Sequence, residues 1–178
     1  MEKGKVIAAV RNSEQLALAA ESGVDIIYML STNIVDLEEH IALAHGGGKR
    51  IFVHLDLAEG IGKDEYGIRY IKERGADGII TTRANIIKLA KKVGIACVQR
   101  FFIIDSQSVA TTAEVVRASK ADMIEIMPGT VTKVIAQLSR ELNVPIVAGG
   151  LLETYEEVEV ALASGAAAVS TGKRELWG

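Results

Sequence analysis

The sequence predicts an α/β protein with the fold of a compact (β/α)8 TIM barrel, in which eight parallel strands alternate with helices and close into a cylinder. Three observations support this prediction. Short apolar runs alternate with amphipathic stretches, a weak internal repeat returns once in every two strand–helix units, and glycine-containing polar loops follow the last two runs. The chain of 178 residues is 49% hydrophobic, so it can bury the core of one domain, which we expect to span residues 1–178.

Eight apolar runs have the length and the content of Ile, Val and Ala that buried parallel strands require. These runs are residues 6–10, 26–30, 51–55, 78–81, 96–101, 123–127, 145–148 and 167–170. The stretches between them have helical composition and an amphipathic pattern, namely residues 13–21, 34–44, 64–74, 84–92, 106–119, 131–142 and 153–163. Strict alternation of the two kinds of element is typical of a parallel sheet covered by helices.

The internal repeat favours a closed barrel over an open sheet. Similar segments precede every second predicted strand, at residues 21–27, 73–80, 119–124 and 164–169. A closed barrel accounts for this period of two units, because its interior layers take side chains from alternate strands. A flavodoxin-like open sheet remains the alternative, since (β/α)8 barrels typically need about 250 residues and only a rudimentary eighth helix fits after Gly172.

The position of a glycine along the strand–helix unit indicates its role. The triple glycine at residues 46–48 follows a helix and precedes a strand, where glycine ends a helix, so we assign it to the structural end of the barrel. Gly149 and Gly150 instead follow a predicted strand directly and begin the loop into the next helix. In barrels, this second end carries the functional residues.

Ser170 and Thr171 occupy the equivalent position after the eighth strand, and Gly172 follows them. The loops after strands seven and eight of a barrel commonly bind phosphate. Glycine lets backbone N–H groups approach an anion closely, hydroxyls add donors, and a helix N-terminus favours negative charge. We therefore predict a phosphate-binding site made by Gly149, Gly150, Ser170 and Thr171. The alternative is that the glycine pair only makes a tight turn.

Polar residues also occur at the ends of other strands, where barrel closure would bring them together. The candidates for this polar mouth are Arg11, His54, Asp56, Arg83 and Glu125. His54 and Asp56 are two residues apart in an extended run and point to one side, where they suit general-base chemistry or recognition of a polar ligand equally. Arg83 suits a bidentate contact with phosphate or carboxylate, or an ion pair with Asp56 or Glu125. Glu125 interrupts an apolar strand and suits contact with ligand hydroxyls or with a basic residue.

Composition excludes several functional classes. The formal net charge of −3 gives no general attraction to nucleic acid. The single cysteine, Cys97, lies in an apolar run, and the histidines lack the spacing of metal ligands, so we expect neither a disulfide nor a metal. No apolar run approaches the roughly 18 residues of a membrane span, and the N-terminus lacks a signal segment. We therefore expect a cytoplasmic protein with no membrane partner.

Several motifs resemble those of the glycerol uptake operon antiterminator regulatory proteins. They are residues 7–11 (IAAVR), 52–57 (FVHLDL) with 60–64 (GIGKD), 78–83 (GIITTR), 99–106 (QRFFIIDS), 124–129 (IEIMPG), 148–151 (AGGL) and 168–171 (AVST). The resemblance covers nearly the whole chain and implies a regulator that senses glycerol 3-phosphate. Such a regulator acts on the leader mRNA of glycerol genes so that transcription passes a terminator. Glycerol 3-phosphate is then an effector ligand rather than a cofactor.

The resemblance also adds Lys133, which matches a lysine of the family pattern, to the candidates for the polar mouth. The chain departs from the family pattern near Lys133, since PGTVTK at residues 128–133 stands where the family tends to have Pro-Gly-Ile followed by Pro-Lys. It also departs after the third predicted strand, where Ala58 replaces a bulky aliphatic residue. Glycerol 3-phosphate offers one phosphate for the two loops and two hydroxyls for carboxylate, histidine or arginine partners. The resemblance and the loop pattern therefore point to the same class of small phosphorylated ligand.

The partners that we expect are leader mRNA and the small phosphorylated ligand, while a homo-oligomer stays open. Aromatic residues, which stack on single-stranded RNA, make up only 4% of the chain, so the pattern does not locate an RNA surface. Basic residues form three candidate groups, each of which is better explained as a solvated helix face than as an RNA surface: Arg69, Lys72 and Arg74; Lys88, Lys91 and Lys92; Lys173 and Arg174.

Two other functions remain open on the sequence. The fold also suits an isomerase, aldolase or synthase acting on a small phosphorylated substrate, with His54, Asp56 or Glu125 as acid or base. A Schiff-base aldolase is disfavoured, because these lysines lie in loops or helices rather than in strand cores: Lys49, Lys63, Lys88 and Lys133. The third alternative is a protein that binds a phosphorylated ligand and acts through a protein partner.

Overall fold

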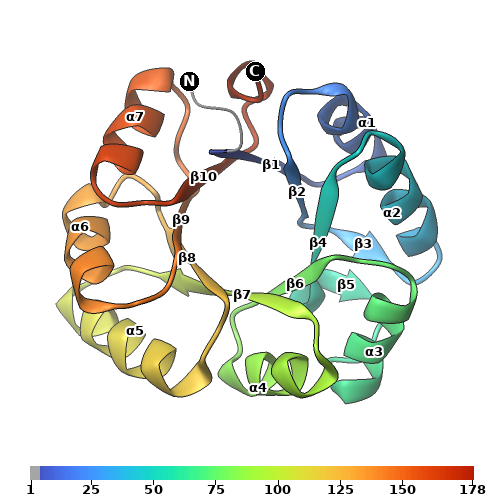
Figure 1. Ribbon diagram of the computed structural model, residues 1–178, viewed down its shortest axis with the longest axis horizontal. Coiled ribbons are helices and arrows are strands. Elements are labelled where there is room, and N and C mark those ends of the chain that lie inside the picture. The colour runs from blue at the N-terminus through green and yellow to red at the C-terminus, as the bar shows by residue number, and fades with distance from the viewer. Residues whose placement is uncertain (1–4) are drawn as a thin grey trace.

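The computed structural model describes residues 5–178, in which eight parallel strands close into a barrel (Figure 1). The strands are β1 (Val6–Val10), β2 (Ile26–Met29), β4 (Arg50–His54), β6 (Gly78–Thr81), β7 (Ala96–Phe102), β8 (Met123–Met127), β9 (Ile146–Gly149) and β10 (Ala168–Thr171). They follow one another around the barrel in chain order, and β10 returns to β1 with Val169 opposite Val6. This last pairing confirms the predicted (β/α)8 barrel, and the flavodoxin-like alternative is wrong.

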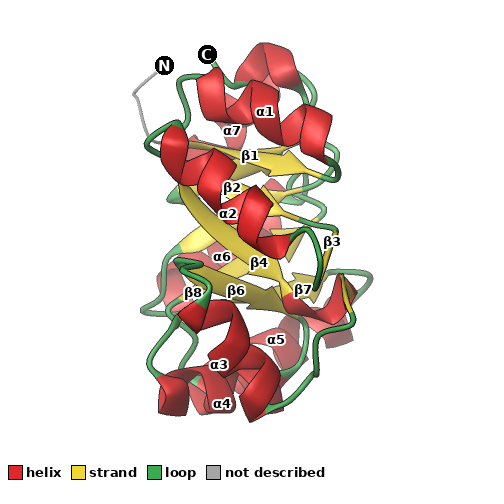
Figure 2. Cartoon of the chain, turned by 90° about the vertical axis from the view of Figure 1, so that its right-hand side faces the viewer, coloured by secondary structure: helices red, strands yellow, loops and turns green. Residues whose placement is uncertain are grey.

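Seven α-helices within residues 5–178 cover the outside of the barrel (Figure 2). They are α1 (Ser13–Glu21), α2 (Leu37–Gly46), α3 (Glu65–Glu73), α4 (Ala84–Val93), α5 (Ser106–Ser119), α6 (Thr132–Glu141) and α7 (Tyr155–Ala163). The helices have only 9 to 14 residues, which explains how so short a chain completes the fold. None of them is long and apolar enough to cross a membrane.

A short 3₁₀ turn, η2 (Arg174–Leu176), stands where an eighth helix would follow β10. Trp177 comes directly after it and is buried, with its indole Nε1 donating to the carbonyl of Thr171 at 2.9 Å. The carbonyl of Trp177 accepts from the N–H of Gly23 at 3.2 Å. These two bonds fasten the end of the described chain to β10 and to the loop that precedes β2.

The segment after β2 departs from the predicted pattern. The helix expected over residues 34–44 begins only at Leu37, because the Asn33 side-chain oxygen accepts the N–H groups of Val35 and Asp36, both at 2.9 Å, and turns the chain there. Before this turn, β3 (Thr32–Asn33) pairs in parallel with β5 (Ala58–Glu59), which follows the 3₁₀ turn η1 (Leu55–Leu57). The resulting two-stranded sheet joins the loops that follow β2 and β4.

The internal repeat has a structural origin. Oδ2 of Asp77 accepts the N–H of Ile51 at 2.8 Å, and Oδ2 of Asp122 accepts the N–H of Cys97 at 3.0 Å. Each aspartate thus satisfies a backbone donor at the start of the preceding barrel strand. The glycine at the end of the third helix, Gly75, adopts a φ of +101°, which glycine tolerates without strain. The repeat therefore belongs to the end of the barrel where strands begin.

Two groups of buried side chains stabilise the barrel. The larger lies between the strands and the helices, and the smaller fills the interior of the barrel: Ile7, Tyr28, Leu30, Phe52, Ile80, Val98 and Val147. Inside, the rings of Tyr28 and Phe52 have centroids 5.8 Å apart. Because side chains alternate along a strand, the residue two positions beyond an interior one also faces inward. This places Arg100 beyond Val98, and His54 beyond Phe52, towards the end of the barrel where the strands finish.

Candidate functional site

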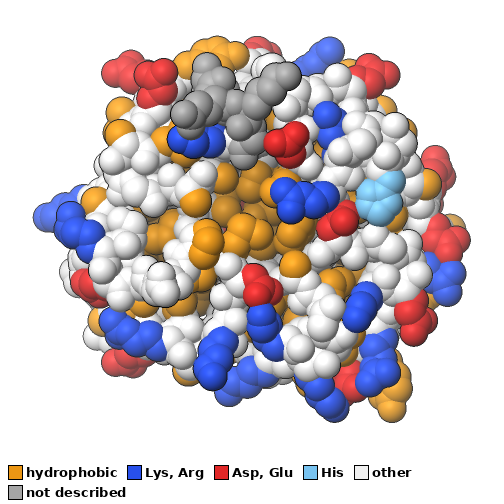
Figure 3. All heavy atoms as spheres, viewed as in Figure 1, with side chains coloured by type: hydrophobic (Ala, Val, Ile, Leu, Met, Phe, Trp, Pro, Cys, Tyr) orange, Lys and Arg blue, Asp and Glu red, His pale blue; other side chains and the backbone are white. Residues whose placement is uncertain are grey.

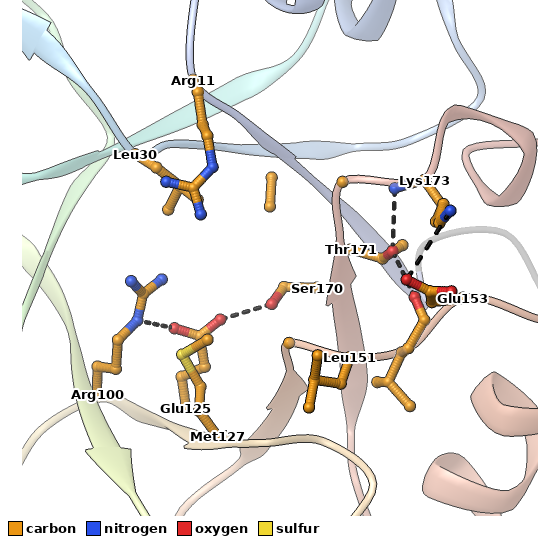
Figure 4. Close-up of a pocket in the computed structure, with 14 residues that line it drawn as sticks. Arg11, Leu30, Arg100, Glu125, Met127, Leu151, Glu153, Ser170, Thr171 and Lys173 are labelled. Carbon is orange, nitrogen blue, oxygen red and sulfur yellow. Dashed lines mark hydrogen bonds and ion pairs between the residues drawn. The ribbon is translucent and has the colours of Figure 1, made fainter.

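A cavity of about 440 Å³ opens at the end of the barrel where the strands finish (Figure 4). Its walls come from β1, β7, β8 and β10 and from the segments that follow β1, β2, β9 and β10: Ala9, Arg11, Leu30, Arg100, Glu125, Met127, Gly150, Leu151, Leu152, Glu153, Ser170, Thr171, Gly172 and Lys173. Five of the residues predicted from the sequence are among them, namely Arg11, Glu125, Gly150, Ser170 and Thr171. The cavity thus joins both predicted phosphate loops to two residues of the predicted polar mouth.

The loop after β9 has an unusual backbone conformation. Gly150 and Leu151 have φ values of +77° and +58°, in the left-handed region that a residue with a Cβ atom adopts at a cost of about 1 kcal/mol or more. The Leu151 side chain is 69% exposed, so burial of that side chain does not explain the strain. The carbonyl of Gly150 accepts the N–H of Gly129 at 2.9 Å, which connects this loop to the one after β8.

Gly149 does not line the cavity but makes room for residues that do. A Cβ atom at this position would lie 2.6 Å from Oγ of Ser170 and closer still to Oε1 of Glu125. The absence of a side chain therefore lets Ser170 Oγ donate to Glu125 Oε1, at 2.5 Å. The structure gives Gly149 a different place from that of Gly150, although the sequence pattern treats them as one pair.

The two hydroxyl groups of the last strand are engaged in hydrogen bonds that join elements. Ser170 donates to Glu125, and Oγ1 of Thr171 donates to the carbonyl of Leu152 at 2.8 Å. Because a hydroxyl has one hydrogen to donate, neither group is available in this arrangement as a donor to an anion. The backbone N–H groups of Gly150, Leu151 and Gly172, by contrast, have no acceptor within residues 5–178.

An ion pair that includes an unpredicted residue forms one wall of the cavity. Nε of Arg100 donates to Oε2 of Glu125 at 2.5 Å, and the two side chains are only 9% and 1% exposed. Arg100 lies directly opposite Glu125 in the pairing of β7 with β8. The signal for Arg100 in the sequence is its place two residues beyond the apolar Val98 in a predicted strand. Side chains with this spacing face the same side of a strand.

Arg11 and Lys173 supply positive charge nearer the opening. The Arg11 side chain makes no ion pair within residues 5–178, and its guanidinium group points into the space that Arg100 also faces (Figure 4). The sequence pattern places Lys173 only in one of the three candidate basic groups. Its side chain is 48% exposed, and its Nζ lies 3.9 Å from Oε1 of Glu153.

His54, Asp56 and Arg83 form a separate group that does not line the cavity. The carboxylate of Asp56 accepts a hydrogen bond from Oγ1 of Thr81 at 2.7 Å. It also accepts hydrogen bonds from the N–H and the hydroxyl of Thr82. Burial alone would raise the pKa of Asp56, but these hydrogen bonds outweigh it and lower the pKa. Nε of Arg83 lies 3.9 Å from Oδ1 of Asp56, the ion-pair arrangement that the sequence left open.

Two buried polar atoms lie in the interior beneath this end of the barrel. Nδ1 of His54 and the hydroxyl of Tyr28 have no hydrogen-bond partner within the described chain. Burial, and secondarily the charge of Arg100, lowers the pKa of His54 to about 4, so the imidazole is neutral at pH 7. Burial, followed by the charge of Glu125, raises the pKa of Tyr28. Tyr28 is not among the site residues predicted from the sequence, in which it resembles an ordinary core aromatic residue.

Lys133 lies away from these groups. It is in the first turn of α6 and faces a groove between α5 and α6, with neighbours that include Ser106, Val109 and Arg117. The resemblance had placed it in the polar mouth, whereas the 440 Å³ cavity does not include it.

Cys97 and the histidines occupy structural positions. Burial raises the pKa of the Cys97 thiol to about 11, so it is protonated at neutral pH. His40 accepts or donates hydrogen bonds with Ser13 and Thr32, and His45 binds Asp77. No group of three His, Cys, Asp or Glu side chains that could hold a metal ion occurs within residues 5–178.

Most of the basic residues on α3 and α4 are already paired. Arg69 and Lys92 both bind Glu65, Lys91 binds Asp122, Arg74 binds Glu38, and Lys72 donates to the carbonyl of Val93. Lys88 and Arg174 have no such partner within the described residues. In Figure 3, basic and acidic side chains both lie around the edge of the face, basic ones predominate along its lower edge, and hydrophobic atoms gather near its centre. The acidic partners therefore balance much of the positive charge on α3 and α4.

Comparisons with known proteins give one consistent result. The family model of the glycerol-3-phosphate responsive antiterminator matches residues 6–177. The solved structure of a glycerol uptake operon antiterminator regulatory protein from Listeria monocytogenes is 34% identical, with a TM-score of 0.93 over 99% of this chain and 96% of that chain. A glycerol uptake operon antiterminator-related protein from Thermotoga maritima is 35% identical, with a TM-score of 0.88 over 99% of both chains.

A relative of undescribed function is equally similar. The uncharacterized Escherichia coli protein YgcP is 35% identical over 178 residues, which cover 99% of this chain and 93% of its own. The family match extends from the first barrel strand to the tryptophan that follows the last one. It therefore includes every element that lines the 440 Å³ cavity. The chain belongs to the glycerol-3-phosphate responsive antiterminator family.

Proposed function

We propose that this chain binds glycerol 3-phosphate and, in response, acts on the leader mRNA of glycerol uptake and metabolism genes so that transcription passes a terminator. Its family and the names of the two bacterial relatives of known structure support this proposal. Glycerol 3-phosphate acts as an effector, and no cofactor takes part.

One observation carries the proposal. The loops after the last two barrel strands border a single cavity, and the backbone N–H groups of Gly150, Leu151 and Gly172 have no acceptor within residues 5–178. Phosphate oxygens are strong acceptors, and glycine allows them to approach the backbone closely. The phosphate is therefore assigned to these two loops, where Lys173 adds positive charge.

The hydroxyl groups of glycerol 3-phosphate are assigned to the inner part of the cavity. There the carboxylate of Glu125 faces the space between Ser170 and the guanidinium groups of Arg11 and Arg100 (Figure 4). A carboxylate accepts hydrogen bonds from hydroxyls, and glycerol itself would lack the contacts to the glycine loops. The ligand should consequently need both its phosphate and its hydroxyls.

Ligand binding has a direct route to a second loop. The carbonyl of Gly150 accepts from Gly129, so a phosphate that orders the loop after β9 also favours one position of the loop after β8. A ligand shifts a conformational equilibrium only as far as it binds one state better than the other. In this proposal, the ordered state of these loops is the state that acts on RNA.

Calorimetric titration of glycerol 3-phosphate and of glycerol tests the proposal. The unaltered protein should bind the phosphate ester and not glycerol, and Gly150→Val should abolish binding, because a branched side chain in the cavity wall would keep the phosphate from the backbone N–H groups of this loop. Gly48→Val is the matched control, since Gly48 has a similar φ of +72° and its Cβ atom would meet no heavy atom within 4 Å. Loss of binding in both variants would show a general effect of backbone strain.

The same titration in the presence of labelled leader RNA separates the remaining functions. Glycerol 3-phosphate should change the affinity for RNA at low salt, where phosphate contacts are strongest. Binding of the ligand with unchanged RNA affinity would instead favour a protein partner. Consumption of the ligand, followed by its chemical analysis, would identify an enzyme, and absence of ligand binding would contradict the proposal as a whole.

A further inference from the structure

The ion pair of Arg100 and Glu125 leaves hydrogen-bonding groups directed into the cavity. Only Nε of Arg100 is engaged, by Oε2 of Glu125, and neither terminal nitrogen, Nη1 or Nη2, has an acceptor within residues 5–178. The Arg100 side chain is nevertheless 9% exposed, and the residue lines the cavity. These N–H groups face the open cavity, so they are available to donate to a ligand acceptor placed there.

Glu125 can accept more hydrogen bonds than it does in this arrangement. Its Oε2 accepts from Arg100 and its Oε1 accepts from Ser170, each at 2.5 Å. A carboxylate has about four acceptor positions, so each oxygen can accept one further hydrogen bond. The two neighbouring side chains therefore present unused donors and unused acceptors on one wall of the cavity (Figure 4).

This combination matches a hydroxyl group better than an anion. A hydroxyl donates one hydrogen bond and accepts others, and a vicinal diol presents two such groups side by side. The positive charge of Arg100 is already balanced by Glu125, so the pair does not require a negatively charged ligand group. A carboxylate placed against this wall would lie beside the charge of Glu125 and be repelled by it, so that only Arg11, which has no ion pair within residues 5–178, would favour it.

The spacing along β10 connects this wall to the phosphate loops. Ser170 contacts Glu125, and Gly172 lies two residues further along the same extended chain. Two residues of a strand span about 7 Å, which a three-carbon skeleton with a terminal phosphate bridges. Gly149 allows the arrangement, because a Cβ atom there would displace Ser170 or Glu125.

We propose that Arg100 and Glu125 form a diol-recognition subsite, in which Glu125 accepts hydrogen bonds from vicinal hydroxyls and the terminal nitrogens of Arg100 donate to them. The subsite rests on the proposed function, because it places the phosphate of the same ligand at Gly150 and Gly172. It makes Arg100 a specificity-determining residue. The site then selects polyol phosphates and rejects phosphorylated carboxylic acids of the same length.

A panel of phosphate compounds tests this selectivity on the unaltered protein. Calorimetry would compare sn-glycerol 3-phosphate with propyl phosphate, which lacks both hydroxyls, and with 3-phosphoglycerate, which carries a carboxylate at the far end. The diol ester should bind at least about tenfold more tightly than either, since a hydrogen bond to a charged group commonly contributes that much. Propyl phosphate reports on the phosphate loops alone.

Two variants assign the selectivity to the pair. Arg100→Gln should reduce the ratio of glycerol 3-phosphate to propyl phosphate affinity towards one. Glu125→Gln keeps the shape of the side chain but removes its charge, and it should lower the affinity for glycerol 3-phosphate while reducing the discrimination against 3-phosphoglycerate. Lys88→Gln, on the exposed face of α4, is the control and should change none of these ratios.

The outcomes distinguish this inference from the proposed function. Equal binding of all three compounds to the unaltered protein would overturn the diol subsite while leaving the phosphate site intact. An unchanged ratio in Arg100→Gln would overturn the assignment of Arg100. Absence of binding for every phosphate compound would contradict the phosphate site itself, and the subsite would fail with it.

Discussion

Arg100 and Glu125 are 25 residues apart in the chain, yet Nε of one lies 2.5 Å from Oε2 of the other inside the barrel. The parallel register of β7 and β8 sets Arg100 directly opposite Glu125, so strand pairing determines the contact. Both side chains are almost entirely buried, at 9% and 1% exposed. A pair so placed affects both the stability of the fold and the chemistry of the cavity.

Breaking this pair should destabilise the protein more than replacing it. Arg100→Met leaves the buried carboxylate of Glu125 without its cation and should lower the free energy of unfolding by about 3–5 kcal/mol. The double variant Arg100→Met with Glu125→Leu removes both charges and should recover part of that loss. Urea unfolding of Arg100→Met, of Glu125→Leu and of the double variant measures the coupling between the two side chains. Strictly additive losses would contradict an interaction between the two side chains.

Gly149→Ala should perturb the inner wall of the cavity. Its Cβ atom would lie 2.6 Å from Oγ of Ser170, so the hydrogen bond from Ser170 to Glu125 must shift. We expect unfolding at lower urea concentration, corresponding to a loss of about 1–3 kcal/mol, together with weaker binding of glycerol 3-phosphate. The control is Gly46→Ala at the end of α2, where a Cβ atom meets nothing within 4 Å and stability should be unchanged or slightly increased. Equal behaviour of the two variants would argue against a steric role for Gly149.

His54 should make stability fall as the solution becomes acidic. Its pKa is about 4 in the folded protein, against an ordinary value of 6.5, so the unfolded chain binds the additional proton between these values. Folding stability is therefore fully present above about pH 6.5 and decreases as the pH falls towards 4, by up to about 3 kcal/mol from this group. Urea unfolding at several pH values would be compared for the unaltered protein and His54→Gln, which should show a shallower pH dependence. An identical slope in both proteins would mean that other groups control it.

Trp177 should report ligand binding through its fluorescence. It is the one tryptophan in the sequence, and its indole Nε1 donates to the carbonyl of Thr171, next to Gly172 in the loop assigned to phosphate. Occupation of that loop should alter the indole hydrogen bond and hence the emission spectrum. The titration midpoint should agree with calorimetry for glycerol 3-phosphate, and Gly150→Val should show no change. A spectral change that also occurs with glycerol alone would not reflect phosphate binding.

Local pattern located the structural elements closely. The eight predicted strands agree with the observed ones to within one residue at either end, because buried parallel strands are continuous apolar runs bounded by turns. The start of α2 was missed, since the Asn33 side chain binds the backbone of residues that would otherwise continue the helix. The pairing of β3 with β5 was also missed, because two-residue strands carry no periodic signal.

Position in the sequence identified some of the residues that line the 440 Å³ cavity and missed others. Gly150, Ser170 and Thr171 follow strands in the sequence, and that position was enough to place them at one end of a barrel. Whether a polar residue lines the cavity depends on its position around the barrel and on its hydrogen-bond partners. His54 and Asp56 lie at the correct end but outside the cavity, whereas Arg100 lies inside it.

The sequence by itself determined the alternation of strands and helices, the closure favoured by the repeat, and the end of the barrel at which the glycine loops lie. Those properties depend on neighbours within a few residues or on a regular period. Only the tertiary structure decided that Arg100 faces Glu125, that Gly149 clears space for Ser170, and that Lys133 lies in another groove. These contacts join segments far apart in the chain, and their geometry is fixed by strand register and side-chain packing, which no local pattern contains.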